Sequence, residues 1–315
     1  MTSYIRPMLL AEIRGTPIQN LISKTVFKHT TVLFPTDDQS LFEQGSGSGT
    51  LTVYKGLKGI LTAAHVAANF QHLPHLFLPY SLLNGTKDTW LIKRVPYLDI
   101  LHIDNLNALL EIQEKGFVWD NDFLDIAFIT IADDVFDALI VKSGKMPIQL
   151  DVYAQKYKAN KKHFLSPNRI NDWFWPIGGS PREESGRSQK DPSILQFKYG
   201  DVFFSGGIIE HEIFALKKVK EKYQGYDADL IKSPLGPTKD ALPQSYDGMS
   251  GGGLFQGKLE EINGHKNISD FMFAGVFVAD NGEYLVSRGP VSLYEVFCEY
   301  LDDVITSRNT SRKSD

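Results

Sequence analysis

Hydrophobic positions along this chain fall mainly into short runs that glycine, proline or polar residues interrupt. The clearest runs are TVFKHTTVLF, GTLTVYKG, KGILTAAH, LDIAFITI, ILQFKYGDVFFSGGIIEHEIFAL, GGGLFQGK and DFMFAGVFVAD. Valine, isoleucine, threonine and aromatic residues dominate them, which favours strands over helices. Because strand and helix patterns do not alternate along the chain, the sequence predicts a mostly β protein rather than a parallel α/β sheet.

Two patterns near the end of the sequence predict particular elements. The run KNISDFMFAGVFVADNGEYLVS is typical of a β-hairpin whose turn is Asp280-Asn281-Gly282. The run PVSLYEVFCEYLDDVI begins with Pro290 and carries apolar residues on one helical face, which predicts a helix over residues 290–305. The polar residues 306–315 lack this periodicity, and we expect them to form a disordered tail.

Composition and charge narrow the classes of protein that fit this pattern. The chain has 315 residues, of which 42% are hydrophobic and 23% are charged, enough material for a two-lobed globular protein. Its net charge of -5 does not support a basic nucleic-acid surface, and no apolar run is long enough to span a membrane. Cys298 is the single cysteine, which excludes an internal disulfide and favours a reducing compartment. We therefore expect a cytoplasmic protein that binds neither nucleic acid nor a membrane.

The run SYDGMSGGGLF places Ser250 in a cluster of glycines, and three interpretations fit it. The fragment Gly248-Met249-Ser250-Gly251-Gly252 matches the G-x-S-x-G elbow of α/β-hydrolases, the G-x-S-G-G loop of chymotrypsin-like proteases and a plain glycine-rich turn. The hydrolase elbow requires an acid and then a histidine after the serine. Only His265 follows Ser250, 15 positions later, which leaves no room for an acid-bearing strand. The order of residues therefore excludes the elbow.

A nucleophilic serine needs a histidine base that a carboxylate orients, and both residues occur upstream. His65 ends the segment Thr62-Ala63-Ala64-His65, directly after an apolar strand. Asp125 opens an alternating apolar strand, where burial would keep its hydrogen bond to an imidazole dry and directional. Asp122 is a competing acid, but no D-I-A-hydrophobic sequence follows it. The order His65, Asp125, Ser250 is that of chymotrypsin-like enzymes.

The motifs T-A-A-H, D-I-A-F-I and G-M-S-G-G, in this order, resemble the three active-site motifs of trypsin-like serine peptidases with the chymotrypsin fold. They are closer to the HtrA-type and other disulfide-free intracellular bacterial members than to the digestive enzymes. The resemblance covers roughly residues 32–304 in outline and implies two six-stranded antiparallel β-barrels. After an N-terminal extension, 1–30, the first barrel lobe would span 31–145 and the second 146–305. Insertions are expected at 70–104 and at the polar, turn-rich 151–195.

The resemblance also implies a role for each residue of these motifs. Ser250 would be the nucleophile, His65 the general base and Asp125 the residue that orients it, with no metal and no cofactor. The backbone N–H groups of Gly248 and Ser250 would form the oxyanion hole. The residues implied for the substrate pocket are Gln244, Asp247, Val278, Ala279 and Asp280. Asp280 also fits the predicted hairpin turn, which is the simpler interpretation of that residue.

One position departs from the secreted members of this family. They carry an aspartate just before the nucleophile, where it binds the new N-terminus after zymogen cleavage, whereas this chain has Met249. HtrA-like members also lack the aspartate, which points to control by a partner or ligand. We expect a regulated bacterial serine endopeptidase, in a stress or defence module, with a protein or peptide substrate and an activating protein partner. The alternatives are a catalytically silent binding module on the same fold and an esterase.

Overall fold

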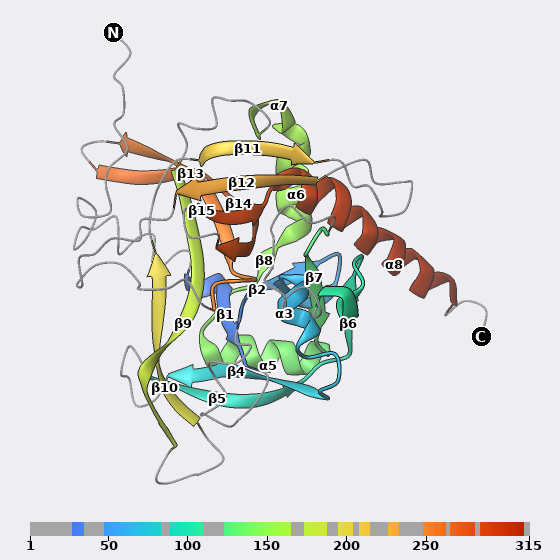
Figure 1. Ribbon diagram of the computed structural model, residues 1–315, viewed down its shortest axis with the longest axis vertical. Coiled ribbons are helices and arrows are strands. Elements are labelled where there is room, and N and C mark those ends of the chain that lie inside the picture. The colour runs from blue at the N-terminus through green and yellow to red at the C-terminus, as the bar shows by residue number, and fades with distance from the viewer. Residues whose placement is uncertain are drawn as a thin grey trace.

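The computed structural model (Figure 1) combines antiparallel β-sheets with several helices. The antiparallel strands and the C-terminal helix of the prediction are confirmed, whereas the two closed barrels stay a prediction. The structure describes residues 27–34, 47–82, 89–109, 123–164, 173–187, 195–203, 208–214, 226–232, 248–262, 265–280 and 284–311. Within these ranges the strands form two sheets. Every strand pairing is antiparallel except a short parallel one between β2 and β8.

The first sheet has six strands in the order β1-β2-β3-β7-β6, with β8 added beside β2. Its strands are β1 (Thr30–Leu33), β2 (Gly47–Tyr54), β3 (Leu57–Thr62), β6 (Asp99–His102), β7 (Ala127–Thr130) and β8 (Ile148–Gln149). Ile60 of β3 lies opposite Leu51 of β2 on one side and Ile129 of β7 on the other. All three side chains are buried, as the alternation of apolar residues in these runs predicts.

The second sheet has nine strands in the order β11-β12-β15-β14-β13-β9-β10-β5-β4. Its strands are β4 (His75–Leu82), β5 (Thr89–Pro96), β9 (Trp173–Arg187), β10 (Leu195–Phe203), β11 (Ile208–Phe214), β12 (Tyr226–Lys232), β13 (Gly253–Ile262), β14 (His265–Asp280) and β15 (Tyr284–Arg288). The predicted C-terminal hairpin is confirmed, because β14 pairs with β15 and places Asp280 opposite Leu285. The long strand β9 pairs with β13 on one side and with β10 on the other, so it links the β11 end of the sheet to the β4 end (Figure 1).

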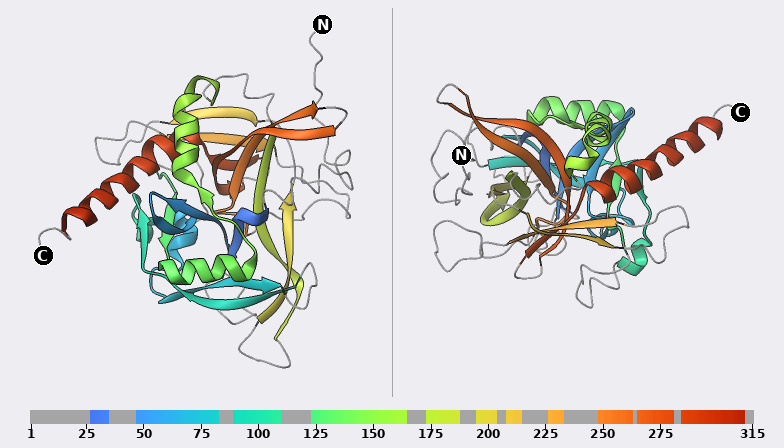
Figure 2. Two further views of the ribbon diagram at one scale, coloured as in Figure 1. Left: turned by 180° about the vertical axis from the view of Figure 1, so that it is seen from behind. Right: turned by 90° about the horizontal axis from the view of Figure 1, so that it is seen from above.

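Helices border the sheets, and several of them were not predicted. The helical segments are η1 (Phe27–His29), α3 (Ala64–Ala68), α5 (Asp133–Ser143), α6 (Leu150–Ala159), α7 (Lys161–Phe164), the π-helix η4 (Ser292–Phe297) and α8 (Cys298–Ser311). Helix α5 has two aspartates in its first turn and ends at Gly144 in the left-handed region, and it lies beside β4 (Figure 2). No helix among the described residues is long and apolar enough to cross a membrane.

The two predicted insertions contain regular secondary structure, and strand pairing crosses the predicted lobe boundary. Residues 70–104 contain β4, β5 and β6, and residues 151–195 contain most of α6 together with α7 and β9. The boundary at 145/146 does not divide the sheets, because β5 pairs with β10 in the second sheet while β8 pairs with β2 in the first. Pairings between strands so far apart in sequence leave no local pattern that the sequence analysis could use.

The predicted disordered tail is also corrected, because residues 306–311 form the end of α8. The hydroxyls of Thr306, Ser307 and Thr310 each donate to the backbone carbonyl four residues earlier, at 2.7–2.8 Å. Arg308 forms an ion pair with Asp99 of β6 at 2.8 Å. These contacts hold polar residues in a helix that extends away from the sheets (Figures 1 and 2), although they lack the apolar periodicity of a packed helix.

A buried carboxylate connects β12 to the start of the C-terminal helical segment. The Oδ1 of Asp227 accepts from the Ser292 N–H at 2.7 Å and from the Ser292 hydroxyl at 2.8 Å, while its Oδ2 accepts from the Val291 N–H at 3.1 Å. The first N–H groups of a helix lack partners inside the helix, so this carboxylate satisfies two of them. Asp227 and Ser292 are both fully buried.

We predict that Ser292→Ala lowers the free energy of unfolding by about 1–3 kcal/mol, because it leaves a buried carboxylate oxygen short of a donor. Chemical denaturation monitored by circular dichroism measures the change. Ser307→Ala is the matched control, since that serine is exposed on the same helical segment, and it should stay within about 0.5 kcal/mol of wild type. Equal effects of the two substitutions would contradict the anchoring role of Ser292.

Candidate active site

His65 lies on α3, the short helix that follows β3. The small residues Ala63 and Ala64 are fully buried, which lets the helix begin directly against the sheet. His65 is the second residue of the helix, and its side chain is 8% exposed. The two small residues therefore allow this histidine to lie close to the sheet.

Asp125 binds His65 at two points. Its Oδ2 lies 2.8 Å from the Nδ1 of the imidazole, and its Oδ1 accepts from the His65 backbone N–H at 2.9 Å. The carboxylate is fully buried, so these contacts are shielded from water. A carboxylate held in this way fixes both the position of the ring and the tautomer that carries the proton on Nδ1. Asp122, the competing acid, lies outside the described residues.

The glycine-rich loop that carries Ser250 is held between the two sheets. On the first-sheet side, the Ser48 N–H donates to the Ser250 carbonyl at 2.7 Å, and the Ser48 hydroxyl donates to the Gly248 carbonyl at 2.6 Å. On the second-sheet side, the Gly251 N–H donates to the Phe277 carbonyl of β14 at 2.8 Å. The loop is therefore fixed by hydrogen bonds from β2 and β14.

Backbone packing brings this loop to the same corner as His65. A Cβ at Gly47 would lie 2.5 Å from Cγ1 of Val66, the residue after His65, and 3.2 Å from the Ser250 carbonyl oxygen. Among the described residues, no hydrogen bond joins the Ser250 hydroxyl to the imidazole. Catalytic hydrogen bonds are often long without substrate and shorten when it binds.

Gly248 and Gly251 both have the left-handed backbone that glycine allows, with φ of 81° and 85°. This conformation is awkward for a residue with a Cβ, which explains the glycine at position 248. Within the part of the chain that the structure describes, the N–H groups of Gly248 and Ser250 donate to no protein acceptor.

Two charged residues that the sequence analysis missed surround the segment before Asp125. The carboxylate of Asp104, 4% exposed, accepts from the Leu124 N–H at 3.0 Å and from the Asp125 N–H at 2.8 Å. Arg288, fully buried at the end of β15, donates to the carbonyls of Leu124 and Phe123 at 3.1 and 2.9 Å. Burial, and then the charge of Asp125, raises the pKa of Asp104 to about 7, although the two N–H donors and Arg288 oppose the shift.

The residues predicted for the substrate pocket are only partly described. Gln244 and Asp247 lie outside the described residues, while Ala279 and Asp280 lie on β14 opposite Val286 and Leu285. Val278 is 1% exposed and belongs to the hydrophobic cluster that also contains residues of α3. The pocket therefore stays a prediction. Among the described residues, no group of three or more His, Cys, Asp or Glu side chains could hold a metal ion.

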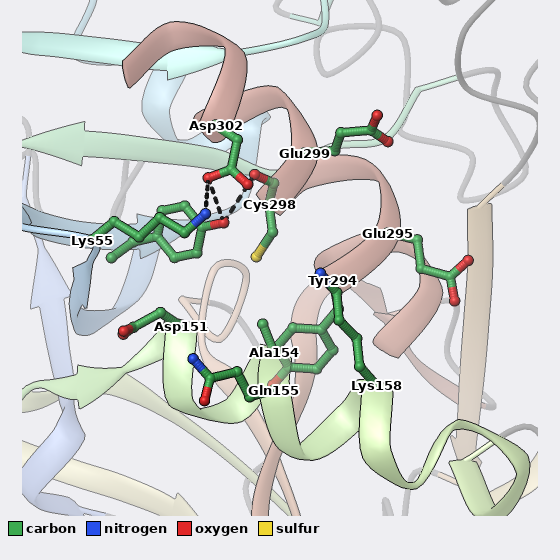
Figure 3. A pocket seen from close by; sticks show the side chains of 11 residues that line it. Lys55, Asp151, Ala154, Gln155, Lys158, Tyr294, Glu295, Cys298, Glu299 and Asp302 are labelled. Carbon is green, nitrogen blue, oxygen red and sulfur yellow. Dashed lines mark hydrogen bonds and ion pairs between the residues drawn. The ribbon is translucent and has the colours of Figure 1, made fainter. Parts of the chain in front are cut away.

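A cavity of about 470 Å³ lies apart from these residues, between α6 and the C-terminal helical segment (Figure 3). It is lined by Tyr54, Lys55, Asp151, Ala154, Gln155, Lys158, Tyr294, Glu295, Cys298, Glu299 and Asp302. Tyr54 donates to Asp302 at 2.9 Å and Lys55 contacts the same carboxylate at 2.6 Å, so this side of the cavity anchors α8 to β2. Burial raises the pKa of the Cys298 thiol, which disfavours the reactive thiolate.

Comparisons with known proteins assign no family to the chain. No protein-family profile matches it, and no curated protein is similar to it. A solved structure from a study of aromatic interactions that drive the coupled folding and binding of the intrinsically disordered Sesbania mosaic virus VPg protein is 14% identical. That match covers 85% of this chain and 90% of the other, with a TM-score of 0.33. At this TM-score the likeness supports no statement about fold or activity.

We predict that Gly251→Ala lowers the free energy of unfolding by about 2–4 kcal/mol, through a strained φ and overpacking together. A Cβ at Gly251 would lie 2.1 Å from both the Ser48 carbonyl oxygen and Thr62 Oγ1. The matched control is Gly56→Ala, because Gly56 has a φ of 88° but nothing within 4 Å of a Cβ. Denaturant unfolding should give the control only the conformational cost, about 1–2 kcal/mol. Identical losses would mean that the crowding around Gly251 is relieved.

We predict that Asp104 makes wild-type stability depend on pH in a way that Asp104→Asn removes. Because the folded pKa, about 7, is above the ordinary value of 3.8, the bound proton stabilises the fold fully below pH 3.8. This stabilisation is lost as pH rises through about 7. The unfolding free energy of wild type relative to the variant should therefore fall by about 2–3 kcal/mol between about pH 5 and about pH 8.

Denaturant unfolding at the two pH values measures this difference. Asp99→Asn is the control, since that carboxylate is half exposed, and its stability should follow the wild-type pH dependence. A wild-type advantage that stays constant or grows with pH would contradict the raised pKa of Asp104.

Proposed function

We propose that this protein is a serine endopeptidase in which His65, Asp125 and Ser250 act as a catalytic triad. The single observation that carries the proposal is the buried two-point contact between Asp125 and His65, at 2.8 and 2.9 Å, at the corner where the Ser250 loop packs. A histidine with a purely structural role needs only one hydrogen-bond partner, whereas His65 is hydrogen-bonded through both its backbone N–H and its ring. Such an arrangement suits a base that must accept a proton at a fixed position.

In this mechanism the Ser250 hydroxyl attacks the carbonyl carbon of the scissile peptide bond. With Nδ1 donating to Asp125, Nε2 of His65 is the ring nitrogen that takes the serine proton and later delivers it to the leaving amine. The negative charge of buried Asp125 stabilises the imidazolium that forms in between. A water molecule, activated by the same imidazole, then hydrolyses the acyl-enzyme.

The tetrahedral intermediate carries an oxyanion that needs preorganised donors. We propose the N–H groups of Gly248 and Ser250 for this role, because they have no protein acceptor among the described residues and flank the nucleophile. The left-handed φ of Gly248 and the bond from Ser48 to its carbonyl hold this peptide in place. Losing one such donor typically lowers the rate about 10²–10³-fold.

The strand order supports a first barrel of six strands. Strands β5 and β6 are separated only by Tyr97 and Leu98, so they can be halves of one bent strand. Strand β4 pairs with β5, and an antiparallel bridge between Phe34 and Phe77 connects it to the end of β1. If β5 and β6 count as one strand, these contacts and the order β1-β2-β3-β7-β6 would close a ring of six strands.

The second sheet supports a second barrel with the same connectivity. Strands β10 and β11 are separated by four residues, 204–207, and they lie at the two ends of the path β11-β12-β15-β14-β13-β9-β10. If they are halves of one strand, the path becomes a ring of six strands. In each ring, strands numbered along the chain then pair in the order 1-2-3-6-5-4. This repetition favours the two-barrel fold that the sequence motifs imply.

The substrate that we propose is a protein or peptide, and we propose that a partner controls the enzyme. The residue before the nucleophile is Met249, 2% exposed, which offers no carboxylate to a newly cut N-terminus. Control by the binding of a partner or ligand is therefore a better fit than activation by zymogen cleavage.

We predict that a fluorophosphonate probe labels wild-type protein at Ser250, because the triad makes this hydroxyl nucleophilic. Mass spectrometry of the modified peptide identifies the site. Ser250→Ala and His65→Ala should abolish the adduct. The matched substitutions Ser307→Ala and His163→Ala, away from the site, should leave it unchanged.

Substrate assays then separate the related activities. Cleavage of peptides by the labelled preparation supports an endopeptidase, whereas turnover of simple esters alone supports an esterase. If neither the purified protein nor the protein in host lysate is labelled or cleaves peptides, the proposed peptidase activity is wrong and a binding module remains.

A further inference from the structure

Asp125 has a backbone conformation that a residue with a Cβ rarely adopts. Its φ of 54° lies in the left-handed region, which costs about 1–2 kcal/mol for such a residue. Strained backbone persists where surrounding contacts over-determine it, and such positions concentrate at functional sites. The contacts that hold this residue therefore bear on how its carboxylate reaches His65.

Two buried side chains of opposite charge hold the backbone around Asp125: a carboxylate binds its N–H groups and a guanidinium binds its carbonyl groups. The Asp104 carboxylate accepts from the two successive N–H groups of Leu124 and Asp125, and Arg288 donates to the two successive carbonyls of Phe123 and Leu124. The peptide group between residues 124 and 125 is thus held from both ends. Rotating that peptide would swing the Asp125 side chain away from His65.

We propose that Asp104 and Arg288 are positioning residues, which together hold the Phe123–Asp125 backbone so that the Asp125 carboxylate keeps its two contacts with His65. This inference rests on the proposed peptidase function for its catalytic consequence. Its structural part, the dependence of the His65–Asp125 contact on the two residues, holds for the folded protein whether or not the protein is active.

Charge explains why both residues are needed. Two buried carboxylates, Asp104 and Asp125, repel each other when both are ionised, and the buried guanidinium of Arg288 offsets part of that repulsion. Ionised Asp104 is acceptor-only and can serve both N–H groups, one with each oxygen. An amide in its place has one acceptor oxygen and an NH₂ group that opposes the second N–H.

Asp104→Asn tests the proposal with two measurements on purified full-length protein. Steady-state peptide hydrolysis should show kcat reduced about 10²-fold with KM within about twofold, as expected for a displaced catalytic group. Proton NMR reports on the strongly deshielded Nδ1–H of an imidazole that donates to a buried carboxylate. This resonance should be lost or move upfield in Asp104→Asn while the protein stays cooperatively folded.

Two further variants make the test specific. Arg288→Lys keeps the charge but lacks the planar fork that serves two carbonyls, so it should also lower kcat and weaken the resonance. Asp99→Asn, the same substitution at a half-exposed carboxylate of β6, should leave both measurements at wild-type values. Unfolding of Asp104→Asn would leave Arg288→Lys to carry the test.

The outcomes separate this inference from the proposed function. A folded Asp104→Asn or Arg288→Lys variant with unchanged resonance and unchanged kcat would overturn the positioning role. A wild-type protein that neither hydrolyses peptides nor reacts with the fluorophosphonate would overturn the peptidase proposal. The resonance would then still decide whether Asp104 and Arg288 hold Asp125 on His65.

Discussion

The buried charge of Asp125 is the constraint on which the rest of the site depends. An ionised carboxylate removed from water is costly unless hydrogen-bond donors surround it, and His65 supplies two such donors. These hydrogen bonds hold the junction between β3 and α3 next to the residues that precede β7. The strained backbone of Asp125 then requires its own support, which Asp104 and Arg288 give. A single buried carboxylate thus determines the placement of four other polar groups.

The two sheets contribute different parts of the candidate site. The first sheet carries His65 and Asp125, whereas the Ser250 loop leads into β13 of the second sheet and is held by β14. Contacts cross between the sheets in both directions: Ser48 of β2 binds the serine loop, and Arg288 of β15 binds the backbone before Asp125. The relative position of the sheets therefore matters for the site, because a shift of one against the other would move the Ser250 loop away from His65.

The sequence allowed prediction of the parts of the site that local patterns encode. The histidine and aspartate were found because each lies beside an apolar strand, and the glycines because of the backbone they allow. Asp104 and Arg288 could not be found, because their partners lie 21 and 164 residues away and neither residue belongs to a motif. The glycine at 253 also had no explanation from sequence. In the structure a Cβ there would lie 2.7 Å from the Phe273 ring and 2.9 Å from Thr50 Oγ1, a crowding that only the fold creates.

The distance along the chain between Arg288 and the backbone it holds has a consequence during protein synthesis. Domains fold from the N-terminal side as the chain emerges from the ribosome. His65 and Asp125 can meet early, but the guanidinium that secures the segment before Asp125 is translated 164 residues after Leu124. The nascent chain would therefore carry an incompletely ordered site for most of its translation. Because of this order of translation, the site would be complete only after the second sheet has formed.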